Sequence, residues 1–253
     1  MKTDRSPELP ACNACRDGDA FDIPITMAFQ PIVDAHARVP WAYEALVRGV
    51  DGSGAMAVLA RVNDTNRYAF DQACRVKAVE LAARLGMDCL LSINFLPNAV
   101  YQPATCLRAT LLAARTHGFP TERLLFELTE TELLHDIGHL CAINTEYRKR
   151  GFRTAIDDFG AGYSGLGLLS QFQPDVIKVD MALVRNIDQD PVRQAIVRGL
   201  LLTTSALGID VVAEGIERAG EYAWLRDAGV RLFQGYLFAR PQVEALPAIA
   251  WPD

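Results

Sequence analysis

Acidic, amide and lysine side chains recur along this chain at the ends of short apolar segments. Between Leu90 and Gln234, such segments end on Asn94, on Glu127, on Asp157 with Asp158, on Lys178 with Asp180, on Glu214 and on Gln234. An earlier segment, WAYEALVRG, carries Glu44 and Arg48. Buried carboxylates are costly unless a metal ion or hydrogen bonds compensate for their charge. The pattern therefore predicts one metal site that is assembled from residues far apart in the sequence.

The donor types in this set favour a hard divalent ion. The candidate ligands are carboxylates and one amide, without His or Cys, and oxygen donors suit Mg²⁺ or Mn²⁺ better than Zn²⁺. Asp157 and Asp158 are adjacent, and a regular strand would point them to opposite faces, but the backbone can turn at a strand end. A carboxylate that bridges two ions about 3.5–4 Å apart is the usual basis of two-metal phosphoester hydrolysis. Lys178 would neutralise excess charge or hold the attacking water; the alternative is a set of structural salt bridges.

Strand and helix patterns alternate along most of the chain. TMAFQPIV and WAYEALV are strand-like and are separated only by DAHARVP, which is too short for a crossover helix, so they predict an antiparallel hairpin. Six further strands follow, most of them separated by segments with helical periodicity. Eight strands in 253 residues predict an α/β fold, a modified TIM (β/α)8 barrel with an antiparallel first strand. Functional groups of such barrels lie at the C-terminal ends of the strands, so the polar residues would meet at one mouth.

Composition limits the class of protein. A hydrophobic content of 50% and a charged content of 22% are typical of a globular domain. The net charge of -6 argues against binding of nucleic-acid polymers, although metal ions could reverse the field locally for a small anionic ligand. We find neither an apolar run of membrane-spanning length nor a secretory h-region, and we expect reduced cysteines in a cytoplasmic protein. Residues 1–20 are polar and predict a flexible tail before one domain at 21–253.

Two motifs suggest other chemistry. The segment 160–165 spells G-x-G-x-x-G after a strand, with Asp180 about twenty residues beyond, as in dinucleotide-binding turns. However, Asp157 and Asp158 directly precede these glycines and would repel a pyrophosphate, and a Rossmann domain normally opens with this turn. We interpret the segment as a flexible loop beside the metals. Cys12-x-x-Cys15 could be redox-active or half of a zinc site, but no second pair completes a tetrad, which favours a tail without a site.

Seven segments, in order, resemble the signatures of EAL-domain cyclic di-GMP phosphodiesterases. They are FQPIVDAHARVPWAYEALVRG, SINF, FELTETE, AIDDFGAGYSGL, DVIKVD, VVAEGIE and FQGYLFARP, and the resemblance extends from about Ile25 to Pro241. The three letters E-A-L are uninformative alone, whereas the ordered set is specific. The resemblance implies that residues 21–253 form a modified TIM barrel that hydrolyses one phosphodiester of cyclic di-GMP to give linear pGpG.

The resemblance also implies a role for individual residues. One ion, Mg²⁺ or Mn²⁺, would be held by Glu44, Asn94, Glu127 and Asp157, and a second ion by Asp157, Asp158 and Glu214. The catalytic residues would be Lys178, Glu214, Gln234 and Glu130. Of these, Lys178 and Gln234 would position the nucleophilic water, with Asp180 close by, and Glu130 would anchor the loop from Asp158 to Leu166. Arg48 would grip a substrate phosphate, because its guanidinium fork suits that task, and Asp180, Leu46 and Gln30 would also contact the substrate.

Departures from the family pattern are small. Phe29, Ala161 and Gly165 replace residues that are more common in the family, and none of the changes removes a metal ligand. The resemblance also makes a homodimer plausible. Two other functions stay open. One is a non-catalytic receptor that binds cyclic di-GMP and acts through a protein partner. The other is a nucleotide-dependent oxidoreductase, which would bind NAD(H) without a divalent metal.

Overall fold

The strands of this protein close into a barrel. The computed structural model describes residues 21–96, 106–129, 137–162 and 165–252. Strands β1 to β8 form the closed ring, because β1 pairs with both β2 and β8. The strands are β1 (Ile25–Asp34), β2 (Val39–Gly49), β3 (Leu90–Asn94), β4 (Leu124–Thr129), β5 (Arg153–Phe159), β6 (Val176–Val179), β7 (Asp210–Ala213), β8 (Leu232–Gln234) and β9 (Gln242–Val243).

The direction of β1 distinguishes this barrel from a regular one. β1 runs antiparallel to β2 and to β8, whereas each successive pair from β2 to β8 is parallel. The prediction of a modified TIM barrel with an antiparallel first strand is therefore confirmed. β9 lies outside the ring and pairs with Ala28 and Phe29 of β1. β9 was not predicted from the sequence, because a strand of two residues carries no periodic signal.

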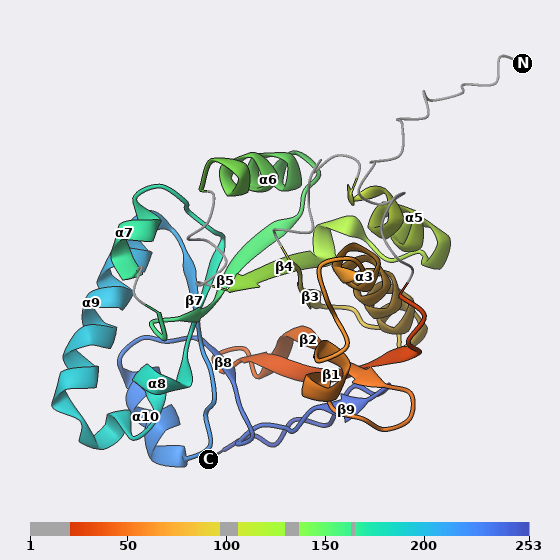
Figure 1. Cartoon of the computed structure of the whole chain (residues 1–253). Coiled ribbons are helices and arrows are strands. Elements are labelled where there is room, and N and C mark those ends of the chain that lie inside the picture. The colour runs from red at the N-terminus through yellow and green to blue at the C-terminus, as the bar shows by residue number, and fades with distance from the viewer. Residues whose placement is uncertain (1–20, 97–105, 130–136, 163–164, 253) are drawn as a thin grey trace, which may run out of the picture.

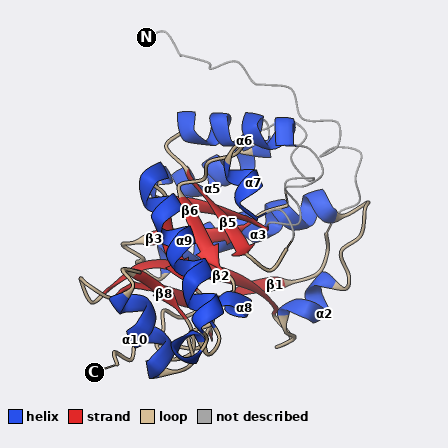
Figure 2. Cartoon of the chain, turned by 90° about the vertical axis from the view of Figure 1, so that its left-hand side faces the viewer, coloured by secondary structure: helices blue, strands red, loops and turns tan. Residues whose placement is uncertain are grey.

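Helices surround the barrel, as Figure 2 shows. They are α2 (Ala55–Leu59), α3 (Arg67–Arg84), α5 (Arg108–His117), α6 (Ile137–Lys149), α7 (Gly165–Leu169), α8 (Met181–Val184), α9 (Pro191–Leu207) and α10 (Ala219–Asp227), with 3-10 turns η2 (Thr121–Arg123) and η4 (Ile187–Gln189). Helices α3 and α5 lie on one side of the barrel and α9 and α10 on the other (Figure 1). The short elements α7, α8, η2 and η4 were not predicted, since one helical turn is too short to show a 3.6-residue period.

Helix α9 illustrates how local sequence sets the boundaries of an element. Asp190 precedes it, and its Oδ1 accepts hydrogen bonds from the backbone N–H groups of Val192 and Arg193. Pro191 occupies the first helical position, where no backbone donor is needed. The helix ends at Gly208, whose φ of 69° is left-handed and favours glycine.

The core has two parts, one outside and one inside the barrel. The larger part lies between the strands and the surrounding helices. The smaller part fills the barrel interior with Ile32, Ala42, Leu125, Ala155, Val176, Val212 and Leu232. This interior cluster forms an apolar floor beneath the polar strand ends. Among the described residues, we find no helix with both the length and the apolar character needed to cross a membrane.

Candidate metal centre

The polar residues at the strand ends lie two positions beyond residues of the apolar floor. Side chains two residues apart on a strand point to the same face. The polar groups therefore point into the barrel, one layer above its floor. These pairs are Ala42 and Glu44, Leu125 and Glu127, Ala155 and Asp157, Val176 and Lys178, Val212 and Glu214, and Leu232 and Gln234. On β1 the order is reversed, with Gln30 preceding Ile32, because this strand runs in the opposite direction.

Lys178 lies at the centre of the polar layer, and only 1% of its side chain is exposed. Its Nζ is 2.7 Å from Glu214 Oε1 and 2.8 Å from Glu127 Oε2. It is also 2.9 Å from Asp157 Oδ1 and 3.4 Å from Glu44 Oε2. One ammonium group cannot balance these four carboxyl groups when all of them are ionised, so ionisation of the whole set would leave an excess of buried negative charge.

Amide and hydroxyl groups fix the orientation of the buried glutamates. Asn94 Nδ2 donates to Glu44 Oε1 at 2.8 Å, and Gln234 Nε2 donates to Glu44 Oε2 at 2.7 Å. Ser92 Oγ donates to Glu127 Oε1 at 2.5 Å. Ser92 was not among the predicted site residues. Its position two residues before Asn94, on the same face of β3, was the signal that could have identified it.

A backbone irregularity brings Asp157 and Asp158 to the same side of the barrel mouth. The pairing of β5 with β6 shifts register between Ile156 and Phe159. Asp158 has a φ of 54°, in the left-handed region that non-glycine residues adopt rarely. As expected, the backbone turns at this strand end. Oxygen atoms of Asp157, Asp158 and Glu214 consequently lie within 4.8 Å of one another.

Electrostatic strain in the centre is visible in its pKa values. Burial raises the pKa of Glu127 well above its ordinary value, the nearby Glu44 and Asp157 add to the shift, and Lys178 only partly opposes it. Burial raises the pKa of Glu214 in the same way. Burial alone would lower the pKa of Lys178, but the surrounding carboxylates outweigh it and the net shift is upward. Burial, with help from Asp157, raises the pKa of Asp158 to about 6.

The residues present fit a pair of hard divalent ions. Oxygen atoms of Glu44, Glu127 and Asp157 form a second group within 4.8 Å, so Asp157 belongs to both groups. Asp157 Oδ1 is close to Lys178 but has no hydrogen bond of acceptable geometry, and the buried Gln234 Oε1 also has no hydrogen-bond partner. Open oxygen acceptors and excess negative charge are what a divalent cation and its bound water would satisfy.

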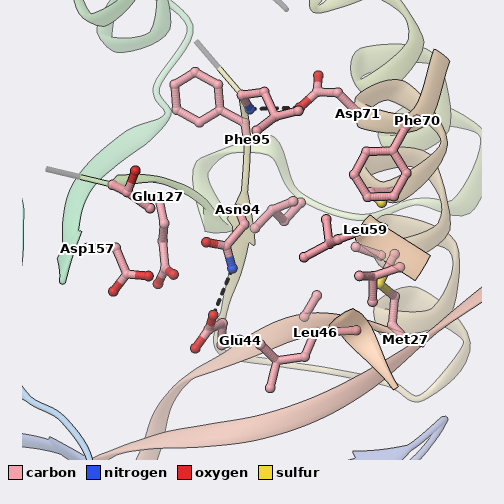
Figure 3. Close-up of a pocket in the computed structure, with 18 of the residues that line it drawn as sticks. Met27, Glu44, Leu46, Leu59, Phe70, Asp71, Asn94, Phe95, Glu127 and Asp157 are labelled. Atoms are coloured by element: carbon pink, nitrogen blue, oxygen red, sulfur yellow. Dashed lines mark hydrogen bonds between the residues drawn. The ribbon is translucent and has the colours of Figure 1, made fainter. Parts of the chain in front are cut away.

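Two cavities flank the carboxylates and share Glu44, Asp157 and Asp158 in their walls. The first, of about 390 Å³, runs from the carboxylates into an apolar arm (Figure 3) that includes Met27, Leu46, Leu59 and Phe70. The second, of about 290 Å³, is lined mainly by polar residues, among them Gln30, Lys178, Asp180, Glu214 and Gln234. The centre is therefore accessible to an extended ligand from two sides.

Some of the remaining predicted residues line the two cavities, and others do not. Leu46 lines the first cavity, and Gln30 and Asp180 line the second. Asp180 also begins α8, where its Oδ1 accepts a hydrogen bond from Ala182 N at 2.7 Å. Arg48 lines neither of these two cavities, and its Nη1 donates to the carbonyl oxygen of Val47 at 2.7 Å. Glu130 lies outside the described residues.

A model of the EAL domain matches residues 23–241. The chain belongs to the EAL domain family. Among solved structures, this EAL chain is 53% identical to a standalone versatile EAL protein of Vibrio cholerae O395 with bound c-di-GMP. The TM-score is 0.88, with 91% of this chain and 98% of that chain covered. The manganese/cy-diGMP complex of Klebsiella pneumoniae BlrP1 at pH 9.0 is 38% identical, with a TM-score of 0.87 over 91% of this chain and 59% of that chain.

Two curated relatives have different descriptions. The EAL chain is 34% identical over 227 residues to the blue light- and temperature-regulated antirepressor BluF of Escherichia coli, covering 89% of this chain and 56% of BluF. It is 34% identical over 162 residues to the cyclic di-GMP phosphodiesterase RocR of Pseudomonas aeruginosa, covering 64% of this chain and 41% of RocR. The EAL chain thus spans only about half of these relatives, which contain further sequence.

Proposed function

We propose that this EAL chain is a metal-dependent phosphodiesterase that hydrolyses cyclic di-GMP to linear pGpG. The observation that carries the proposal is the pair of carboxylate groups that share Asp157 at the barrel mouth. Such an arrangement suits two-metal phosphoester hydrolysis. Support comes from RocR, which is named a cyclic di-GMP phosphodiesterase, and from family structures that contain cyclic di-GMP.

These carboxylate groups support the two ligand sets that the family resemblance implies. One ion, Mg²⁺ or Mn²⁺, would be held by Glu44, Asn94, Glu127 and Asp157, and the other by Asp157, Asp158 and Glu214. When bound, two such ions lower the pKa of a water molecule and neutralise charge on the phosphoryl oxygens. Among the described residues, Lys178 supplies the one ammonium group that contacts the carboxylates of both groups. Further positive charge, such as that of divalent ions, would be needed to neutralise these carboxylates.

The protein's own groups would bind and orient the attacking water. Without metal, the surrounding carboxylates hold the pKa of Lys178 well above its ordinary value, and Lys178 would serve as a cation and hydrogen-bond donor to the water. Gln234 Nε2 is fixed by Glu44, which leaves Gln234 Oε1 open to accept a hydrogen bond from the water. The two flanking cavities would receive the two halves of the substrate, with Leu46 on one side and Gln30 and Asp180 on the other. Arg48 would have to turn from Val47 to reach a phosphate.

Metal binding should depend on pH in a defined direction. The pKa of Asp158 is about 6 in the folded protein, above the value of about 3.9 expected for an unfolded chain. Its contribution to stability is therefore present at low pH and is lost as the pH rises through about 6.

Divalent ions bind the ionised form of Asp158, so protons compete with them below this pH. We expect Mn²⁺ to raise the melting temperature more at about pH 8 than at about pH 5.5, as measured by differential scanning fluorimetry.

The control for this measurement is Asp158→Asn, which removes the titrating carboxyl group and should reduce the difference between the two pH values. A Mn²⁺-induced shift that is equal at both pH values in the unaltered protein would contradict the involvement of Asp158 in metal binding.

A second function is a cyclic di-GMP receptor that acts through a protein partner, and the description of BluF as an antirepressor favours it. The two functions separate in one experiment. The purified protein is incubated with cyclic di-GMP and Mg²⁺ or Mn²⁺, with an EDTA control, and the products are resolved by chromatography. Metal-dependent formation of pGpG would support the phosphodiesterase. Intact cyclic di-GMP, together with binding in calorimetry, would support the receptor.

A further inference from the structure

A buried ion pair on α3 lies beside the first cavity. Arg75 Nη2 contacts Asp71 Oδ2 at 2.6 Å, and each side chain is only 1% exposed. A buried pair of charges is costly unless further hydrogen bonds satisfy both partners. Both partners here make such bonds, and they make them to segments outside α3. The pair therefore connects α3 to other parts of the fold.

Asp71 holds the backbone directly after β3. Its Oδ1 accepts a hydrogen bond from Leu96 N at 3.0 Å (Figure 3), two residues beyond the candidate metal ligand Asn94. The intervening Phe95 donates its backbone N–H to the carbonyl oxygen of Glu127 at 3.0 Å. The chain that leaves Asn94 is thus held at two successive residues, by β4 and by α3.

Arg75 extends the same connection to the start of α5. Its Nη1 donates to the carbonyl oxygen of Cys106 at 3.2 Å and to Thr110 Oγ1 at 3.1 Å. Leu96 and Cys106 are the described residues on either side of positions 97–105. One ion pair therefore holds the chain where it leaves β3 and where it enters α5.

We infer that Asp71 and Arg75 are positioning residues that act on the metal centre through Asn94. Asn94 is the last residue of β3 and its side chain is exposed, so little packing restrains it. Its Nδ2 must nevertheless lie 2.8 Å from Glu44 Oε1, which requires a fixed backbone. The ion pair supplies that constraint at Leu96. Partners that orient a metal ligand typically change metal affinity by about 10–100-fold. This inference rests on the proposed metal centre.

Mn²⁺ affinity of the full chain, measured from free Mn²⁺ by electron paramagnetic resonance, tests this inference. Asp71→Asn preserves size but presents an amide N–H₂ to either Arg75 or Leu96 N, so one of the two bonds is lost. We expect a loss of Mn²⁺ affinity of about tenfold or more. Asn94→Ala should weaken binding similarly. Asp71→Asn should add nothing in the Asn94→Ala background, because coupled residues are not additive.

Thr154→Val is the matched control. Thr154 is also buried, at the start of β5, and its Oγ1 donates to Asn144 Oδ1 at 2.9 Å. Its replacement should lower the melting temperature without changing Mn²⁺ affinity. If Asp71→Asn does not fold, Arg75→Lys serves instead. It retains a positive charge beside Asp71 but cannot also reach Cys106, and it should weaken Mn²⁺ binding several-fold.

The outcomes distinguish this inference from the proposed function. If the unaltered protein binds no Mn²⁺, the proposed metal centre fails, and the inference fails with it. If the unaltered protein binds Mn²⁺ and Asp71→Asn, or Arg75→Lys in its place, retains the same affinity, the ion pair has only a structural role. Full additivity with Asn94→Ala would equally overturn the inference, while the proposed function would stand.

Discussion

Asp157→Asn should lower kcat for cyclic di-GMP hydrolysis by about 10³-fold or more. Asp157 is the only residue among those described that belongs to both carboxylate groups, so a neutral amide at this position would weaken the proposed site for both ions. The expected loss exceeds the about 10–100-fold effect typical of removing a hydrogen-bond partner of a metal ligand. Initial rates of pGpG formation at saturating Mn²⁺ measure it.

Asp157→Asn should nevertheless leave the fold intact. The substitution removes a contact with Lys178 at 2.9 Å, but it also removes a negative charge that raises the pKa values of Glu127 and Glu214. Asp210→Asn is the matched control, because Asp210 lies at the opposite end of its strand and its partly exposed side chain pairs with Arg231. The control should retain full activity. Turnover of Asp157→Asn within tenfold of the unaltered protein would refute the site.

Lys178→Met should destabilise the metal-free protein by about 3–5 kcal/mol at neutral pH, the usual cost of removing one partner from a buried set of charges. The Lys178 side chain is 1% exposed and contacts four carboxylates, which would lose their shared cation. Turnover should also be lost, since the water would lose a donor. Urea denaturation in the presence of EDTA measures the change in the free energy of unfolding.

The control for this change is Lys149→Met, because Lys149 is exposed in the last turn of α6 and should change stability by less than about 0.5 kcal/mol. Mn²⁺ should recover part of the stability of Lys178→Met, because the ions would replace the missing positive charge. A Lys178→Met protein as stable in EDTA as the control would show that the carboxylates do not depend on Lys178.

Much of the fold and the candidate site could be predicted from the sequence, because both follow from local periodicity. Short apolar strands alternating with helical segments predict the barrel. The two-residue repeat on each strand then places the polar residue above the apolar floor, as Ala155 and Asp157 illustrate. Once the sheet closes into a barrel, these polar residues meet at one mouth, and no other contact between distant segments is needed to bring them together.

Other features depend on contacts between segments distant in sequence. The adjacent aspartates allow a turn at the end of β5, but no residue pattern signals the register shift between β5 and β6 or the left-handed φ of Asp158 that accompanies it. Asp71 lies 25 residues before Leu96, so the connection from α3 to β3 appears only in the structure. Nothing in the sequence indicated that the Arg48 guanidinium would donate to the carbonyl oxygen of Val47, as it does in the structure. Four statements stay predictions: the cytoplasmic location, the homodimer, the role of Glu130 in anchoring a loop, and the flexible tail at residues 1–20.

The most direct measurement is turnover of cyclic di-GMP while Mn²⁺ is titrated into the metal-free protein. We predict no pGpG without metal, a rate that rises as Mn²⁺ is added, and saturation near two equivalents per chain, because two carboxylate groups share Asp157. Hydrolysis that persists in excess EDTA, or intact cyclic di-GMP at saturating Mn²⁺, would contradict a two-ion phosphodiesterase centre at the barrel mouth.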